Sequence, residues 1–256
     1  MFNNNLPWDL PHHRYAVLGI PRSGSQLFES FIKYSLKQKD ETAVDLQEIF
    51  TAHNPLIHTI YNEEGVIKSE VGSTVDFWNA KKVSHSNLEM IRNSNPNQPM
   101  TCRIFLHNNN SNYNFADSIK YAKELNFKFV YINRSFEHTM LSLVFANESF
   151  IWNKTKNTAK LNIDVDQLKT MIASAYIYMT LNKRVLDSLT EYDEVSYENI
   201  VDAANTLSTE EKTKAYGVFV EKQLPLDPYE QILNVDEVKD VFRNFYPKVK
   251  EMAENL

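Results

Sequence analysis

A glycine-containing turn near the N-terminus has the residue types of a phosphate-binding loop. Residues 19–25 read Gly-Ile-Pro-Arg-Ser-Gly-Ser and end an apolar run at residues 15–20 that predicts a buried strand. Residues 26–36 place apolar side chains at helical spacing, so strand, turn and helix follow in the order that such a loop requires. The backbone N–H groups of the turn and the N-terminus of the helix favour an anion there.

The position of the cation distinguishes this turn from the loop of a nucleoside triphosphatase. The Walker A pattern places a lysine directly after its second glycine, where this chain has Ser25. The basic side chain is instead Arg22, inside the turn. A glycine turn that caps a helix and binds nothing has the same residue types, so the turn alone leaves that alternative open.

A second basic position follows the strand predicted at residues 127–132. Arg134 comes just after this strand, and Ser142 stands eight positions later on a predicted helix that begins near Phe136. An arginine can grip a phosphate through two parallel charge-assisted hydrogen bonds, and a serine hydroxyl adds a donor. Both motifs follow strands of a predicted parallel sheet, and such sheets bind ligands beyond the carboxyl ends of their strands.

Together the two motifs resemble those of the sulfotransferases, of the bacterial or phage type, that use 3′-phosphoadenosine 5′-phosphosulfate (PAPS). The turn matches the family pattern Pro-Lys/Arg-Ser-Gly-Thr/Ser-Thr, except that Gln26 replaces the last hydroxyl residue. The resemblance implies that Arg22 neutralises the sulfate and the bridging oxygen of PAPS. It also implies that Arg134 and Ser142 hold the 3′-phosphate. The implied donors to the 5′-phosphate are Ser23, Gly24, Ser25 and Gln26.

A third segment, Val-Ser-Tyr-Glu-Asn-Ile at residues 195–200, is similar to another stretch of the family. The match implies that Tyr197 contacts the adenine. By residue type alone, a core tyrosine at the end of a strand is an equal alternative. Because neither ATP nor GTP carries a 3′-phosphate, a 3′-phosphate site would separate a protein that uses PAPS from a kinase.

Sulfuryl transfer needs a base that accepts the proton of the attacking hydroxyl or amine. In one branch of the family this base is a glutamate shortly after the first helix, which implies Glu48 here. Glu48 and Arg22 are therefore the expected catalytic residues. His53 and His107 are alternative bases. No metal is expected, since the chain has no His/Cys cluster with zinc spacing.

Strands alternate with helices along the chain, which predicts an α/β fold. We expect a central, mostly parallel sheet flanked by helices on both faces, a three-layer sandwich like that of the P-loop NTPases. The predicted elements span residues 15–20, 26–36, 101–106, 114–125, 127–132, 164–189, 194–197 and 235–245, with Pro247 interrupting the last. We expect residues 1–256 to form a single domain.

The composition narrows the class of protein. Of 256 residues, 43% are hydrophobic and 23% are charged, which is ordinary for a soluble globular protein. The net charge of −6 argues against nucleic acid as a partner. The single cysteine, Cys102, fits a reducing compartment, and no stretch reaches the roughly 18 apolar residues that span a bilayer.

These features predict a cytoplasmic enzyme that transfers a sulfuryl group from PAPS to a hydroxyl or amine, with a carbohydrate or small metabolite favoured as acceptor. A nucleotide-dependent kinase with a degenerate Walker A loop and a non-catalytic nucleotide-binding scaffold are the alternatives. The sequence leaves open which acceptor is used, what residues 55–100 do and how many chains assemble.

Overall fold

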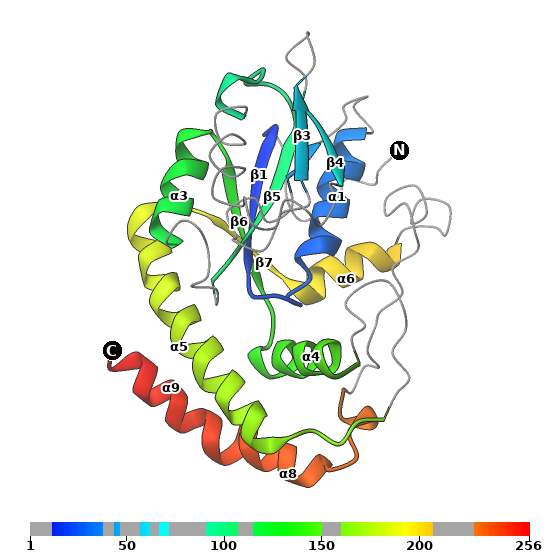
Figure 1. Ribbon diagram of the computed structural model, residues 1–256, viewed down its shortest axis with the longest axis vertical. Helices are drawn as coiled ribbons and strands as arrows, with labels where there is room; N and C mark the ends of the chain where they lie inside the picture. The colour runs from blue at the N-terminus through cyan, green and yellow to red at the C-terminus, as the bar shows by residue number, and fades with distance from the viewer. Residues whose placement is uncertain are drawn as a thin grey trace.

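In the computed structural model a five-stranded parallel sheet lies between two layers of helices (Figure 1). The strands are β1 (Arg14–Gly19), β2 (Val44–Asp45), β5 (Met100–Phe105), β6 (Lys128–Asn133) and β7 (Asp193–Ser196). An antiparallel pair, β3 (Ile57–Tyr61) and β4 (Ile67–Val71), forms a separate two-stranded sheet. The structure describes residues 12–37, 44–46, 57–61, 67–71, 91–106, 115–149, 160–206 and 228–256. The expected α/β sandwich is confirmed.

The helices follow the strands in alternation for most of the chain. They are α1 (Ser25–Lys37), α3 (Phe115–Glu124), α4 (Phe136–Ser149), α5 (Val165–Leu189), α6 (Tyr197–Thr206), the short η2 (Pro228–Gln231), α8 (Val235–Asp240), η3 (Val241–Phe245) and α9 (Tyr246–Glu254). Within the described ranges, none of these helices combines the length and the hydropathy that crossing a bilayer requires.

Alternating side chains of β1 explain why both faces of the sheet are covered. Tyr15 and Val17 are buried against α1 and α6, whereas Ala16 and Leu18 are buried against α3 and α5. Successive residues of a strand point to opposite faces, so a strand that is apolar throughout needs helices on both sides. The apolar run that predicted a buried strand therefore also accounts for the three layers.

The strand order β2-β5-β1-β6-β7 fixes where a ligand can approach the sheet. From β1 the chain moves to β2 on one side, and from β6 it moves to β7 on the other side. Since β1 and β6 are neighbours, the connections diverge between them, and open parallel sheets bind ligands at the carboxyl ends of the two strands at such a point. The turns after these two strands carry Arg22 and Arg134.

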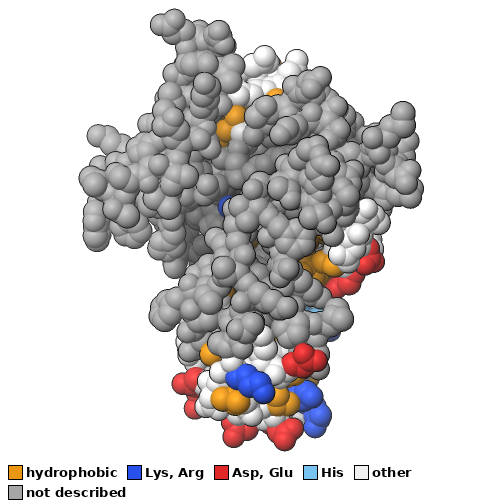
Figure 2. All heavy atoms as spheres, turned by 90° about the vertical axis from the view of Figure 1, so that its right-hand side faces the viewer, with side chains coloured by type: hydrophobic (Ala, Val, Ile, Leu, Met, Phe, Trp, Pro, Cys, Tyr) orange, Lys and Arg blue, Asp and Glu red, His pale blue; other side chains and the backbone are white. Residues whose placement is uncertain are grey.

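A second hydrophobic core lies beyond the carboxyl edge of the sheet. It is built from α4, the N-terminal half of α5, and the helices α8, η3 and α9, which lie together in the lower part of Figure 1. Figure 2 shows charged side chains of both signs beside apolar ones at this end of the molecule. Helix α5 joins the two cores, because Leu168 and Ile172 pack in the second core and Leu186 packs against the sheet.

Pro247 does not end the C-terminal helical segment, contrary to expectation. The helical run continues to Glu254 through a π-helical turn at Val241–Phe245. Proline has no backbone N–H, so the helix loses one hydrogen bond at this point. The preceding residue, Tyr246, donates its backbone N–H to the carbonyl of Val241, one residue further back than in an α-helix. The proline thus sits in the first turn of α9.

Candidate functional site

The turn between β1 and α1 has an unusual backbone at two positions. Arg22 has a φ of 72° and Gly24 has a φ of 99°. The backbone N–H of Ser23 donates to the carbonyl of Ile20 at 3.0 Å and closes the turn. A positive φ is disfavoured for arginine, and residues held in such conformations cluster at ligand-binding sites.

Two glycines allow other groups to approach this turn closely. A Cβ on Gly19 would lie 2.5 Å from Oγ of Ser23, so the turn folds back directly over the end of β1. A Cβ on Gly24 would lie 2.6 Å from Cδ2 of Tyr197, whose ring rests against the turn. The hydroxyl of Ser23 is buried and has no hydrogen-bond partner among the described residues. A buried hydroxyl of this kind is a ready donor for a bound anion.

Arg134 reaches the turn from the end of β6. Its Nη1 donates to the carbonyl of Arg22, and its guanidinium carbon lies 4.0 Å from the ring centroid of Tyr197. Its Nε is buried without a hydrogen-bond partner among the described residues. Burial lowers the pKa of Arg134, against the opposite effects of Tyr197 and Glu198. An arginine stays protonated even so, and Arg134 therefore places a partly desolvated positive charge beside the turn.

Arg22 completes a pair of cations. Its Nε donates to Oγ of Ser142 on α4 at 3.2 Å. Burial lowers the pKa of Arg22, and the neighbouring charge of Arg134 lowers it further. Two partly buried like charges at one place are unfavourable until an anion offsets them. The arrangement therefore suits a ligand with more than one negative charge.

The local sequence explains why Ser142 faces the turn. Residue Ser135 begins α4, since its Oγ accepts the N–H of His138 at 3.4 Å and its carbonyl accepts the N–H of Thr139 at 2.9 Å. From this start the helix carries Ser142 to a buried position facing Arg22. Serine caps of this type fix where a helix begins, and so fix which residues share a face.

Of the predicted cofactor-binding residues, the structure brings six together and places two others at the start of α1. The six are Arg22, Ser23, Gly24, Arg134, Ser142 and Tyr197. Ser25 is buried in the first turn of α1, whereas the side chain of Gln26 is exposed. The predicted base Glu48 and its alternatives His53 and His107 lie outside the described residues, so the assignment of the base stays a prediction.

Asn182 is a polar residue at the edge of the site that the sequence interpretation missed. It lies on the buried stripe of α5 that otherwise consists of Leu168, Ile172, Ala175 and Leu186. Its Nδ2 donates to the carbonyl of Leu106 at 2.5 Å, and the N–H of Leu106 donates to the carbonyl of Gly19 at 2.8 Å. The signal was present in the sequence as one amide at helical spacing among apolar residues.

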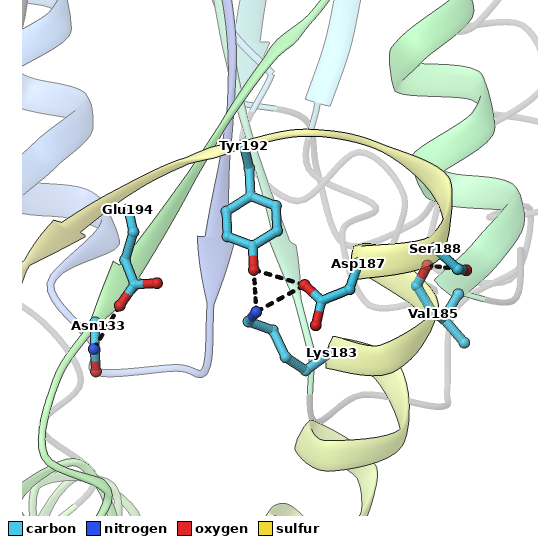
Figure 3. A network of polar contacts seen from close by, with 7 residues as sticks. All are labelled: Asn133, Lys183, Val185, Asp187, Ser188, Tyr192 and Glu194. Carbon is cyan, nitrogen blue, oxygen red and sulfur yellow. Dashed lines mark hydrogen bonds and ion pairs between the residues drawn. The ribbon is translucent and has the colours of Figure 1, made fainter.

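A network of polar contacts supports the strand that leads to Arg134 (Figure 3). Asn133 donates from Nδ2 to Oε1 of Glu194 at 2.7 Å and so joins the last residue of β6 to β7. Beside it, Lys183 on α5 and the hydroxyl of Tyr192 both donate to Asp187, at 2.8 and 2.6 Å. These contacts hold the connection from α5 to β7 against α5, and the ring of Tyr192 meets that of Tyr131 in β6 edge-on at 6.0 Å.

No protein-family model matches this chain, and no curated protein matches it significantly. Within the described ranges, no group of three or more His, Cys, Asp or Glu side chains is placed to hold a metal ion. The chemistry of the site is therefore inferred from its own residues.

Proposed function

We propose that the chain is a sulfotransferase that moves a sulfuryl group from PAPS to a hydroxyl or amine and releases 3′-phosphoadenosine 5′-phosphate (PAP). One observation carries the proposal. Arg22 and Arg134, which are 112 residues apart in the chain, meet beyond the carboxyl ends of β1 and β6. PAPS has anionic groups at both its 5′ and 3′ positions, so two cations on separate elements match its charge distribution.

The site residues divide between the two ends of the nucleotide in this proposal. Arg22 and the N–H groups of the turn face the 5′-phosphosulfate, and Arg134 and Ser142 face the 3′-phosphate. In the structure Arg22 donates to Ser142, a contact between a cation and a neutral hydroxyl. Phosphate oxygens are stronger acceptors, so binding would replace this contact by charge-assisted hydrogen bonds. Tyr197 is then free to border the adenine.

The transfer step balances with these groups. The acceptor oxygen or nitrogen forms a bond to sulfur while the bond between sulfur and the bridging oxygen breaks. The bonding electrons stay on the bridging oxygen of PAP, where Arg22 stabilises the charge that develops. The acceptor proton goes to a base, for which Glu48 remains the predicted residue. We assign no step to a metal.

We place this activity in the cytoplasm, because the single cysteine of the chain fits a reducing compartment. A carbohydrate or another small metabolite is the acceptor class that we favour. The net charge of −6 supports a small acceptor over a polyanionic one, since like charges repel.

Calorimetric titration with PAP and, in parallel, with ATP tests the proposal. We expect PAP to bind more tightly than ATP. Replacing Arg134→Ala removes a charged hydrogen-bonding partner and should weaken PAP binding by about 10- to 100-fold. The matched control is Arg92→Ala, which removes an exposed arginine that pairs with Glu124 and should leave PAP binding unchanged.

The other outcomes of this titration identify the alternatives. Tighter binding of ATP than of PAP, with no effect of Arg134→Ala, would contradict the proposal and favour a nucleotide-dependent kinase. Tight PAP binding without transfer to any acceptor would favour a nucleotide-binding scaffold.

A further inference from the structure

Three aromatic rings from three helices meet at the start of α4. The ring of Phe136 is stacked on Tyr246 of α9, with centroids 5.1 Å apart and planes 15° apart. Tyr176 of α5 meets both rings edge-on, at 5.0 Å from Phe136 and 5.2 Å from Tyr246. Phe136 is the first residue of α4 and follows Arg134 by two positions. The three rings thus pack around the first residue of α4, two positions after Arg134.

The π-helical turn at Val241–Phe245 comes directly before Tyr246. Such turns are rare, less favourable than α-helix, and frequent at functional sites. Tyr246, the residue after this turn, is the one that stacks on Phe136. Phe242, within the turn, contacts the ring of Tyr246 edge-on, with centroids 6.3 Å apart. Burial, together with the charge of Tyr176 and a hydrogen bond with it, raises the pKa of Tyr246, so its hydroxyl stays neutral. Tyr246 thus contributes a neutral, half-buried ring to this contact.

A second contact holds the next residue of α4. The hydroxyl of Tyr229 in η2 donates to Oε1 of Glu137, and the ammonium of Lys239 lies 4.9 Å from the ring of Tyr229. Glu137 is in the first turn of α4, where a carboxylate is favoured by the helix dipole. Two residues of this turn are therefore held by segments near the C-terminus.

Arg134 lies in the short connection between β6 and α4. Its backbone leaves β6 at Asn133 and enters α4 through Ser135. A tilt of the first turn of α4 would move Arg134 relative to the turn at residues 19–25. It would also move Ser142, two helical turns further along. A cation displaced by about 1 Å loses much of the benefit of a preorganised contact.

We propose that Tyr246 is a positioning residue of the anion site, since its stack on Phe136 fixes the first turn of α4 and thereby the placement of Arg134 and Ser142. The inference rests on the proposed function, because PAP is the ligand whose binding it predicts. No contact of Tyr246 with the ligand is required.

Titration of three variants with PAP, at a temperature where each is folded, tests this role. Tyr246→Leu removes the stacked ring and should weaken PAP binding about tenfold. Tyr246→Phe keeps the ring and should bind PAP as the wild type does. Phe242→Leu is the matched control, because Phe242 is buried and contacts Tyr246 but has no ring contact with Phe136. It should lower the melting temperature and leave PAP binding unchanged.

Phe136→Leu removes the same stack from the other side. It should weaken PAP binding to the same extent, and the double variant with Tyr246→Leu should add little, because both changes abolish one interaction. If Tyr246→Leu does not fold, Phe136→Leu carries the test alone.

The outcomes separate this inference from the proposed function. Wild-type affinity for PAP in both Phe136→Leu and Tyr246→Leu overturns the inference while the proposed function stands. Equal losses of affinity in Phe242→Leu and Tyr246→Leu also overturn it, since general loosening of the second core would then be the cause. A wild-type protein that does not bind PAP removes the proposed function and this inference together.

Discussion

Arg22 and Gly24 both have positive φ angles, but for different physical reasons. At Gly24 the conformation is cheap, and the missing Cβ leaves room for the ring of Tyr197. At Arg22 a positive φ is unfavourable because the residue has a side chain. In this conformation the carbonyl of Arg22 accepts a hydrogen bond from the guanidinium of Arg134. The backbone strain of the turn thus lies at Arg22, the residue that we propose binds the sulfate.

Gly24→Ala tests the close approach at this turn. The new Cβ would meet the ring of Tyr197 at 2.6 Å and would face an unfavourable φ. We expect the free energy of unfolding to fall by about 1–3 kcal/mol and PAP binding to weaken, because the turn or the ring must move. Chemical denaturation and PAP titration measure the two effects.

Combining Gly24→Ala with Tyr197→Ala separates the steric clash with the ring from the backbone strain at residue 24. In the double variant the ring is gone, so Gly24→Ala should then cost only the strain of φ, about 1 kcal/mol. Strict additivity of the two single changes would contradict the role that we give to the contact between Gly24 and Tyr197.

Among the elements, α5 is linked to the carboxyl edge of the sheet by a buried amide. It spans both cores, and Asn182 joins it to the carbonyl of Leu106 where β5 ends. A buried amide in an apolar stripe is unfavourable unless it is hydrogen-bonded. We infer that this bond sets the distance between α5 and the turn that follows β1.

Asn182→Asp makes this bond depend on pH. A protonated carboxyl can still donate to the carbonyl of Leu106, whereas a buried carboxylate is repelled by it, so the pKa of the new side chain should rise on folding. The stability that the bond provides is then present below the unfolded pKa of about 3.9 and is lost as pH rises through the folded pKa. We expect the free energy of unfolding to match the wild type near pH 4 and to be about 3 kcal/mol lower near pH 8.

Denaturation of Asn182→Asp and wild type across this pH range measures the effect. The matched control is Ser174→Asp, an exposed position on the same helix, which should show little difference from wild type at either pH. A loss of stability in Asn182→Asp that is the same at both pH values would show that the bond to Leu106 is not what the variant disturbs.

Local pattern was sufficient for elements such as β1 and α1 but not for the contacts between elements. The apolar run at β1 and the helical spacing in α1 predicted both elements, because each buries its own pattern of side chains. That Arg22 and Arg134 lie at the carboxyl edge of the sheet was predictable because each follows a strand. Two contacts depend instead on how distant segments pack. They are the hydrogen bond from Arg22 to Ser142 and the contact of Arg134 with the ring of Tyr197, the first residue of α6. The π-helical turn was missed for the same reason.

At the scale of the whole molecule, the site lies between two hydrophobic cores. The turn at residues 19–25 belongs to the sheet, whereas Ser142 belongs to α4 in the second core. Near the site, the contacts that join the two sides include the bond from Arg22 to Ser142 and the ring of Phe136, which packs against both cores. A ligand that binds residues of both sides would therefore add to the coupling between the cores.

Amide hydrogen exchange with and without PAP measures that coupling. Ligand at about 100 times its dissociation constant should stabilise the protein by about 2.7 kcal/mol. If PAP joins the cores, exchange should slow in α4 and α9 as well as in the turn and the start of α1. ATP has no 3′-phosphate and should protect the turn more than α4, and Arg134→Ala should remove the protection that PAP gives to α4. Protection confined to the turn and α1 would mean that the nucleotide is held by the sheet side alone, and the 3′-phosphate would then need a partner other than Ser142.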